Sequence, residues 1–124
     1  MRLVIGGAHQ GKLAWALQDT GLTNQEVVDG QTCSLINGTS AAVLDGLHHL
    51  VRRALEENLD PVAVCMAYIG PDTVIICDEV GCGVVPLRRE ERQWREATGR
   101  LCGTLAQQAD RVDRVLCGLS QRIK

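Results

Sequence analysis

The chain is 124 residues long and contains no phenylalanine, so we expect a single domain over residues 1–124 with a core of aliphatic side chains. Because its formal net charge is −2, the protein as a whole has no electrostatic attraction to nucleic acid or to an anionic membrane. No stretch approaches the roughly 20 apolar residues of a membrane span, and the first apolar run is too short for a signal peptide, so the sequence predicts a soluble cytoplasmic protein.

The first part of the chain alternates between short apolar runs and a helical pattern. Residues 2–6 predict a buried strand that stops at glycine, and residues 11–20 predict a helix that Gly21 ends. Residues 26–30, with the sequence Glu-Val-Val-Asp-Gly, predict a second short strand. This second strand is closed by an acid and a glycine.

Residues 38–58 predict a long helix. Four apolar side chains recur there at the three- and four-residue steps of one helical face, namely Leu44, Leu47, Val51 and Leu55. Thr39 or Ser40 is the expected N-cap, because a hydroxyl accepts a hydrogen bond from the first free amides of a helix. His48 falls beside the apolar stripe, so we expect a partly buried, hydrogen-bonded histidine there rather than a ligand.

The second half of the chain has one ambiguous segment. Residues 60–70 fit a helix, because an acid followed by proline is typical of a helix start, but their apolar residues also fit a strand. Residues 72–81 predict a buried strand that ends in acids and a glycine, and residues 81–86 predict a glycine-rich loop. A long helix and a final strand complete the chain, over residues 89–110 and 111–119.

The turn after the first strand has the pattern of a phosphate-binding loop. Its sequence is Gly-Gly-Ala-His-Gln-Gly-Lys-Leu, and it stands between a strand and a helix, as such a loop requires. Backbone amides of a loop of this kind surround an anion, and a lysine neutralises the outer phosphates. We therefore expect nucleotide contacts from Gly6, Gly7, Ala8, His9, Gln10, Gly11, Lys12 and Leu13.

This loop and the alternation of strands with helices indicate the fold. Parallel strands joined by helices form a sheet covered on both faces. We expect an α/β fold like that of the P-loop NTPases, with a mostly parallel sheet of about four to five strands between helices in three layers. Ligands bind such sheets beyond the carboxyl ends of the strands. The free edges of so small a sheet favour a homo-oligomer.

Leu13 stands where the loop pattern calls for serine or threonine, whose hydroxyl binds Mg²⁺. Because leucine cannot bind a metal, Mg²⁺ would need a carboxylate at the end of a later strand. Asp29 is in such a position and is our predicted metal ligand, with Asp78 and Glu79 as a second source of carboxylates. The alternative is that the glycines only form a tight turn and that Lys12 is solvated.

The six cysteines fit no zinc pattern, and nothing indicates a secretory context. Most of them lie inside apolar runs, where a reduced cysteine packs as a small apolar side chain. We therefore expect free packing thiols rather than a framework of disulfides.

Several segments resemble one family, the bifunctional adenosylcobinamide kinase / adenosylcobinamide-phosphate guanylyltransferases of cobalamin biosynthesis. The loop parallels that family's Gly-Gly-Ala-x-x-Gly-Lys-Ser, and residues 27–32 are similar to its Asp-Cys-Leu-Thr, with Asp29 and Thr32 matching. Residues 77–86 resemble its Asn-Glu-Val-Gly-x-Gly-x-x-Pro, with Asp78 in place of asparagine. The tail from Trp94 to Lys124 also follows the family's closing pattern.

The resemblance implies phosphoryl transfer from ATP or GTP, with Mg²⁺, to a hydroxyl of adenosylcobinamide. Lys12 and Glu79 would be its catalytic residues, Lys12 by neutralising phosphate and Glu79 by orienting the acceptor or the metal. The chain is short between Thr20 and Glu26, where family members carry the histidine that accepts the guanylyl group. We therefore predict a cobinamide kinase-like protein that lacks the guanylyltransferase segment. The alternative is a noncatalytic relative that binds nucleotide or a partner protein.

Overall fold

The computed structural model describes residues 1–81 and 88–124, and these form a six-stranded sheet in the order β2-β3-β4-β1-β5-β6. Strands β1 to β5 pair in parallel, whereas β6 pairs with β5 in the antiparallel sense. The strands are β1 (Arg2–Gly6), β2 (Val27–Asp29), β3 (Val43–Asp45), β4 (Val74–Asp78), β5 (Arg111–Leu116) and β6 (Leu119–Arg122).

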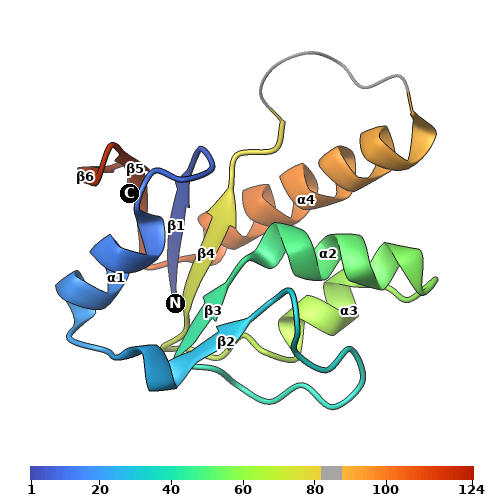
Figure 1. Cartoon of the computed structure of the whole chain (residues 1–124), viewed down its shortest axis with the longest axis horizontal. Helices are drawn as coiled ribbons and strands as arrows, with labels where there is room; N and C mark the ends of the chain where they lie inside the picture. Colours follow the sequence, from blue (N-terminus) through green and yellow to red (C-terminus); the bar gives the residue numbers. More distant parts are fainter. Residues whose placement is uncertain (82–87) are drawn as a thin grey trace.

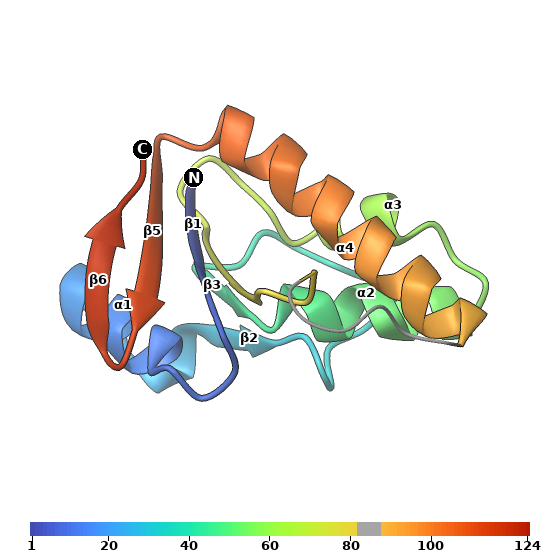
Figure 2. The ribbon, with the colours of Figure 1, turned by 90° about the horizontal axis from the view of Figure 1, so that it is seen from above.

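Helices cover both faces of this sheet (Figures 1 and 2). One face carries α1 alone among the described helices, and the other carries α2, α3 and α4. Their bounds are α1 (Lys12–Thr20), α2 (Leu47–Glu56), α3 (Pro61–Met66) and α4 (Arg89–Gln108), with a 3₁₀ turn, η1, at Asn24–Glu26. The predicted three-layer α/β fold is confirmed.

Alternation along the central strands divides the core between the two faces. Leu44 and Ile75 point toward α2, α3 and α4, whereas Val43 and Ile76 point toward α1, and all four are at most 1% exposed. Successive side chains of a strand face opposite ways, so a strand buried on both faces is apolar throughout. This is why the Val-Ile-Ile-Cys run of β4 occupies the middle of the sheet.

The prediction of one helix over residues 38–58 is wrong at its beginning. Residues Val43–Asp45 form strand β3, and α2 begins only after Gly46, whose φ of 86° is the left-handed conformation that glycine adopts readily. Gly46 is therefore the N-cap, instead of Thr39 or Ser40. Leu44 fits the three-residue spacing of the helical stripe, but it is buried as a strand residue between β2 and β4.

The predicted final strand is in fact a hairpin. Strand β5 ends at Leu116, the chain turns through Cys117 (φ 52°) and Gly118 (φ 74°), and β6 returns beside β5. With β3, this raises the strand count of the described residues above the predicted four to five. The ambiguous segment forms a helix, α3, because the Asp60 side chain accepts a hydrogen bond from the amide of Val62 and caps it.

Other expectations concern the thiols, the membrane and the glycine-rich loop. The described cysteines, Cys33, Cys65, Cys77, Cys102 and Cys117, are all free thiols, as predicted. Within residues 1–81 and 88–124, no helix is both long enough and apolar enough to cross a bilayer. The loop predicted over residues 81–86 lies outside the described residues except for Gly81.

Candidate functional site

A pocket of about 640 Å³ opens at the carboxyl ends of the parallel strands. The loop after β1 and the start of α1 form one wall of it, through residues 8–14. The ends of β2, β3 and β4 and the first turn of α2 form the rest. The pocket therefore lies where parallel α/β sheets bind their ligands.

The loop that forms this wall is held by the β5–β6 hairpin. The side-chain carbonyl of Gln10 accepts a hydrogen bond from the amide of Cys117 (2.6 Å), and its main-chain carbonyl accepts one from the amide of Gly118 (2.8 Å). At the other end of the loop, a Cβ on Gly6 would collide with the main-chain oxygen of Val115. Gly6 thus allows β1 to approach β5, and Gly11, with φ 85°, allows the turn into α1.

Lys12 is the first residue of α1, and its side chain reaches back into the loop. Its Nζ lies 2.7 Å from the carbonyl oxygen of Gly7 and 2.6 Å from Oδ1 of Asp78, and only 7% of the residue is exposed. The next residue, Leu13, lines the pocket and packs against the core beneath α1, but supplies no oxygen for a metal. The cation of the loop is therefore paired with a carboxylate of the same protein.

His48 holds the other side of Asp78. Its Nδ1 accepts a hydrogen bond from the Asp78 amide at 3.1 Å, and its Nε2 lies 3.2 Å from Oδ2 of the same residue. The indole of Trp94 donates to the carbonyl oxygen of His48 at 2.7 Å and ties this turn of α2 to α4. Burial lowers the pKa of His48 to about 4 although Asp78 opposes the shift, so the ring is neutral near pH 7.

Three carboxylates end adjacent strands on the α1 side of the sheet. Asp29 lies opposite Asp45 in the β2–β3 register, and Asp45 lies opposite Ile76, two residues before Asp78. Because side chains alternate along a strand, all three carboxylates face the pocket. Burial, followed by the charge of Asp29, raises the pKa of Asp45.

The residues present are compatible with Mg²⁺ bound together with a phosphate ligand. Among the described residues, no group of three or more His, Cys, Asp or Glu side chains is placed to hold a metal ion. However, Mg²⁺ is commonly held by one or two carboxylates together with substrate phosphates and water. Asp29 and Asp45 line the pocket and are the carboxylates that could serve in this way.

Four residues singled out in the sequence do not line this pocket: the first two glycines of the loop, Gly6 and Gly7, together with Glu79 and Thr32. Glu79 follows Asp78 but accepts two hydrogen bonds from Arg114 of β5, at 2.8 and 3.1 Å. Thr32 lies in a turn in which its amide donates to the carbonyl oxygen of Asp29. Neither is among the pocket-lining residues. The catalytic role of Glu79 therefore stays a prediction.

Sequence reasoning missed Asp45 and gave no site role to His48. The signal for Asp45 is a near-repeat: Val-Val-Asp-Gly at the end of β2 returns as Val-Leu-Asp-Gly at the end of β3. Asp45-Gly46-Leu47 also agrees with the Asp and Leu of the Asp-Cys-Leu-Thr pattern, on a strand that pairs directly with β4. The repeat is not evident in the sequence because Leu44 also fits the helical spacing of the apolar residues that follow it.

The fold and the loop define the class of protein: a three-layer α/β protein like the P-loop NTPases, with a pocket at the carboxyl ends of its parallel strands. Comparison with known families identifies it further. A model described as cobinamide kinase / cobinamide phosphate guanyltransferase matches residues 20–123, and the chain belongs to that family. The resemblance found in the sequence is thereby confirmed.

A curated relative is the bifunctional adenosylcobalamin biosynthesis protein CobU of Salmonella typhimurium (strain LT2). It is 31% identical to this chain over 74 residues, which are 60% of the chain and 41% of the Salmonella protein. The family match begins at residue 20, after the loop. The assignment of the loop residues therefore depends on the geometry described above.

Proposed function

We propose that this protein binds a nucleoside triphosphate in the pocket and transfers its terminal phosphoryl group to a hydroxyl of adenosylcobinamide. The observation that carries this proposal is the side chain of Lys12, which the loop directs into a pocket of about 640 Å³ beside three carboxylates. Family membership supplies the acceptor class. Both ATP and GTP are compatible with a site that contacts phosphates.

In this proposal, the residues of the chain act by position and charge, as is usual in phosphoryl transfer. The amides of residues 7–11 and Nζ of Lys12 would bind the outer phosphates at the start of α1. Asp29, the metal ligand predicted from the sequence, and Asp45 would hold Mg²⁺, and the bound ion would neutralise charge on the transferred group. Leu13 leaves the metal without its usual hydroxyl ligand, so we expect metal affinity to be weak.

The guanylyltransferase reaction is left out of the proposal. Helix α1 ends at Thr20 and β2 begins at Val27, with only the turn Asn24–Glu26 between them. This connection is too short for the additional strand and helix that the family pattern places there. We therefore propose the kinase half of the chemistry alone.

Titration calorimetry tests the binding site. ATP and GTP, each with and without Mg²⁺, are titrated into wild-type protein and into Lys12→Ala. Loss of Lys12 should weaken binding at least about 100-fold, because its charge is the only one from the loop. Lys124→Ala is the matched control: it removes the other lysine of the chain, which donates to carbonyl oxygens at the end of α4. Equal affinity of Lys12→Ala and wild type would refute the site.

A second candidate, a noncatalytic nucleotide-binding relative, is favoured by two observations. Leu13 cannot bind a metal, and Asp78 already pairs with Lys12. Incubation with radiolabelled ATP, Mg²⁺ and adenosylcobinamide separates the two functions. A labelled corrinoid phosphate supports the kinase, whereas binding of nucleotide without any transfer supports the noncatalytic relative.

We also propose a homo-oligomer in the cytoplasm. Strand β6 forms an edge of the sheet, and three apolar side chains near it are exposed: Leu116, Leu119 and Ile123, at 57%, 75% and 58%. An apolar edge strand favours pairing with another chain. The free thiols among the described cysteines agree with a reducing compartment. Light scattering on wild type and Leu119→Lys tests the assembly: a dimer or larger species should dissociate in the variant.

A further inference from the structure

The contact between Lys12 and Asp78 determines what kind of anion can enter the pocket. The carboxylate Oδ1 lies 2.6 Å from Nζ, so an oxygen of this protein occupies a place that a phosphate oxygen would take on the loop lysine. A phosphate that reaches Lys12 must either displace this carboxylate or lie beside it. Both arrangements place two negative charges, the phosphate and the carboxylate, close together in a partly buried site, where they repel each other.

Asp78 is not free to swing away from the lysine. Its main chain is part of β4, where it lies opposite Gly6 of β1, and its amide donates to Nδ1 of His48. The second carboxylate oxygen, Oδ2, lies 3.2 Å from Nε2 of the same ring. His48 is itself 6% exposed and held through its carbonyl oxygen by Trp94. The carboxylate is therefore fixed from the side opposite Lys12.

The rest of the pocket adds negative charge. Asp29 and Asp45 line it together with Asp78, so three carboxylates face a single lysine in the part of the pocket that the structure describes. The nearby carboxylate of Glu79 is balanced by Arg114 and lies outside the lining. A bare polyphosphate would therefore meet a net negative site, whereas a polyphosphate complexed with a divalent cation would bring the charge that these carboxylates accept.

We propose that Asp78 is a specificity-determining residue: by occupying Lys12, it makes the pocket select a nucleotide complexed with a divalent cation over the free nucleotide. This inference depends on the proposed nucleotide site and adds a property to it. Asparagine, which stands here in the family pattern, would keep the shape of the side chain without the charge. The substitution to aspartate thus changes the form of ligand that the site accepts.

The test compares affinities for ATP with Mg²⁺ and with EDTA, measured by calorimetry on wild type and Asp78→Asn. In wild type, Mg²⁺ should strengthen binding by at least about 100-fold, and in Asp78→Asn by about tenfold or less, mainly because free ATP binds more tightly. Tripolyphosphate should behave as ATP does, since the selection acts on phosphates. Asp72→Asn is the matched control, because Asp72 is exposed in the turn before β4. The substitution removes the same charge as Asp78→Asn does, but outside the pocket.

The outcomes separate this inference from the proposed function. If the Mg²⁺-to-EDTA ratio is the same in Asp78→Asn and wild type, the role of Asp78 is refuted while the nucleotide site stands. If no protein binds nucleotide under any condition, the proposed function fails, and this inference fails with it. Asp78→Ser serves as a second charge-removing variant, and thermal melting of each variant shows that the folded proteins are compared.

Discussion

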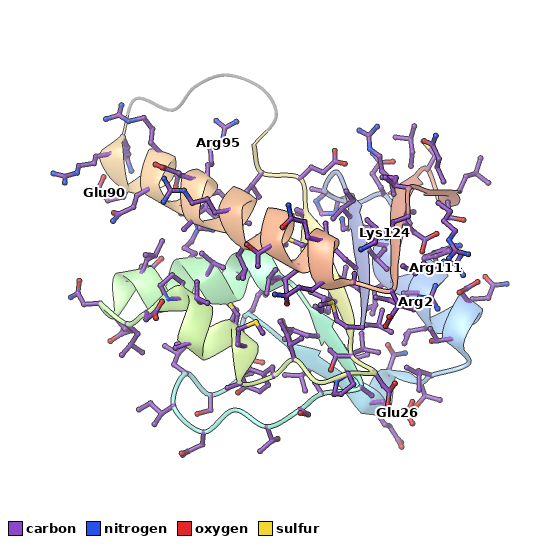
Figure 3. The ribbon with its side chains drawn as sticks, turned by 180° about the vertical axis from the view of Figure 1, so that it is seen from behind. Arg2, Glu26, Glu90, Arg95, Arg111 and Lys124 are labelled. Carbon is purple, nitrogen blue, oxygen red and sulfur yellow. The ribbon has the colours of Figure 1, made fainter. Side chains whose placement is uncertain are left out.

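Two clusters of charged side chains lie on the same face of the sheet, at opposite ends of its strands. The first, at the amino ends, consists of Arg2, Asp19, Arg111 and Asp113, and Figure 3 shows Arg2 and Arg111 close together there. The second, at the carboxyl ends, is the pocket cluster of Lys12, Asp29, Asp45, Asp78 and His48. Both contain a buried charged residue next to α1.

The clusters differ in how their charges are balanced. In the amino-end cluster, fully buried Asp113 accepts two hydrogen bonds from Arg111 (2.8 and 3.1 Å) and lies 3.7 Å from Arg2, which also pairs with Asp19. Two arginines thus meet two carboxylates. In the pocket cluster, three carboxylates meet one lysine and a neutral histidine. Balanced charge serves the fold, whereas an excess of one sign leaves capacity for a ligand of the other sign, which in our proposal is a divalent cation.

The largest effect on stability should come from the balanced cluster. Asp113→Ala removes the buried carboxylate that Arg2 and Arg111 share, and the loss of its two charged hydrogen bonds from Arg111 should cost about 3 kcal/mol. Urea unfolding measures this loss. Asp110→Ala is the control: Asp110 is 84% exposed in its pair with the N-terminal amine, so its loss should change the free energy of unfolding little. Similar losses in the two variants would contradict the structural role of the amino-end cluster.

The next effect is a pH dependence that originates in the pocket cluster. The pKa of His48 is lowered from 6.5 to about 4, so the unfolded chain takes up its proton first as the pH falls. The stability contributed by neutral His48 is present above about pH 6.5 and is lost progressively toward pH 4, by at most about 3 kcal/mol.

Urea unfolding of wild type and His48→Gln at pH 7 and pH 4.5 isolates this contribution. Glutamine does not titrate, so the variant should lose less stability between the two pH values than wild type does. Acids that do not contact His48 titrate equally in both proteins and cancel in the difference. An identical pH dependence would mean that folding does not lower the pKa of His48.

A smaller effect on stability, with a larger one on binding, is expected for Lys12→Ala. Asp78 retains 24% exposure, and its bond to His48 persists, so the loss of its lysine should cost only about 1–2 kcal/mol in urea unfolding. The variant should nevertheless lose nucleotide. Asp113→Ala should show the reverse, with a large loss of stability and little loss of binding. If Lys12→Ala unfolds as readily as Asp113→Ala, the proposed difference between the two clusters is contradicted.

The smallest effect is expected for Leu13→Ser, which supplies the hydroxyl that the loop pattern calls for. Affinity for ATP with Mg²⁺ should rise a few-fold, by up to about 1 kcal/mol, whereas affinity for ATP with EDTA should not change, since the hydroxyl acts through the metal. Leu13→Ala controls for the loss of packing beneath α1. A gain in both conditions would show that the hydroxyl contacts the phosphates directly.

The amino-acid sequence by itself determined the layers of the fold, the loop after β1 and the family. Apolar runs that end in glycine and alternate with helical patterns are local features, and a parallel sheet follows from their order. The position of Lys12 at a strand-to-helix turn is local in the same way. Asp29 was predicted as a metal ligand because its strand ends visibly in an acid and a glycine.

Tertiary structure alone decided which acids enter the pocket. Asp78 and Glu79 are adjacent in sequence, but the register of β4 with β1 turns Asp78 toward Lys12, and Glu79 pairs with Arg114 of β5. Asp45 was hidden because Leu44 fits a helical stripe and a buried strand equally well, and only pairing with β2 and β4 distinguishes them. The physical reason is that hydrophobic spacing reports burial, whereas the direction of a side chain depends on which strands lie beside it.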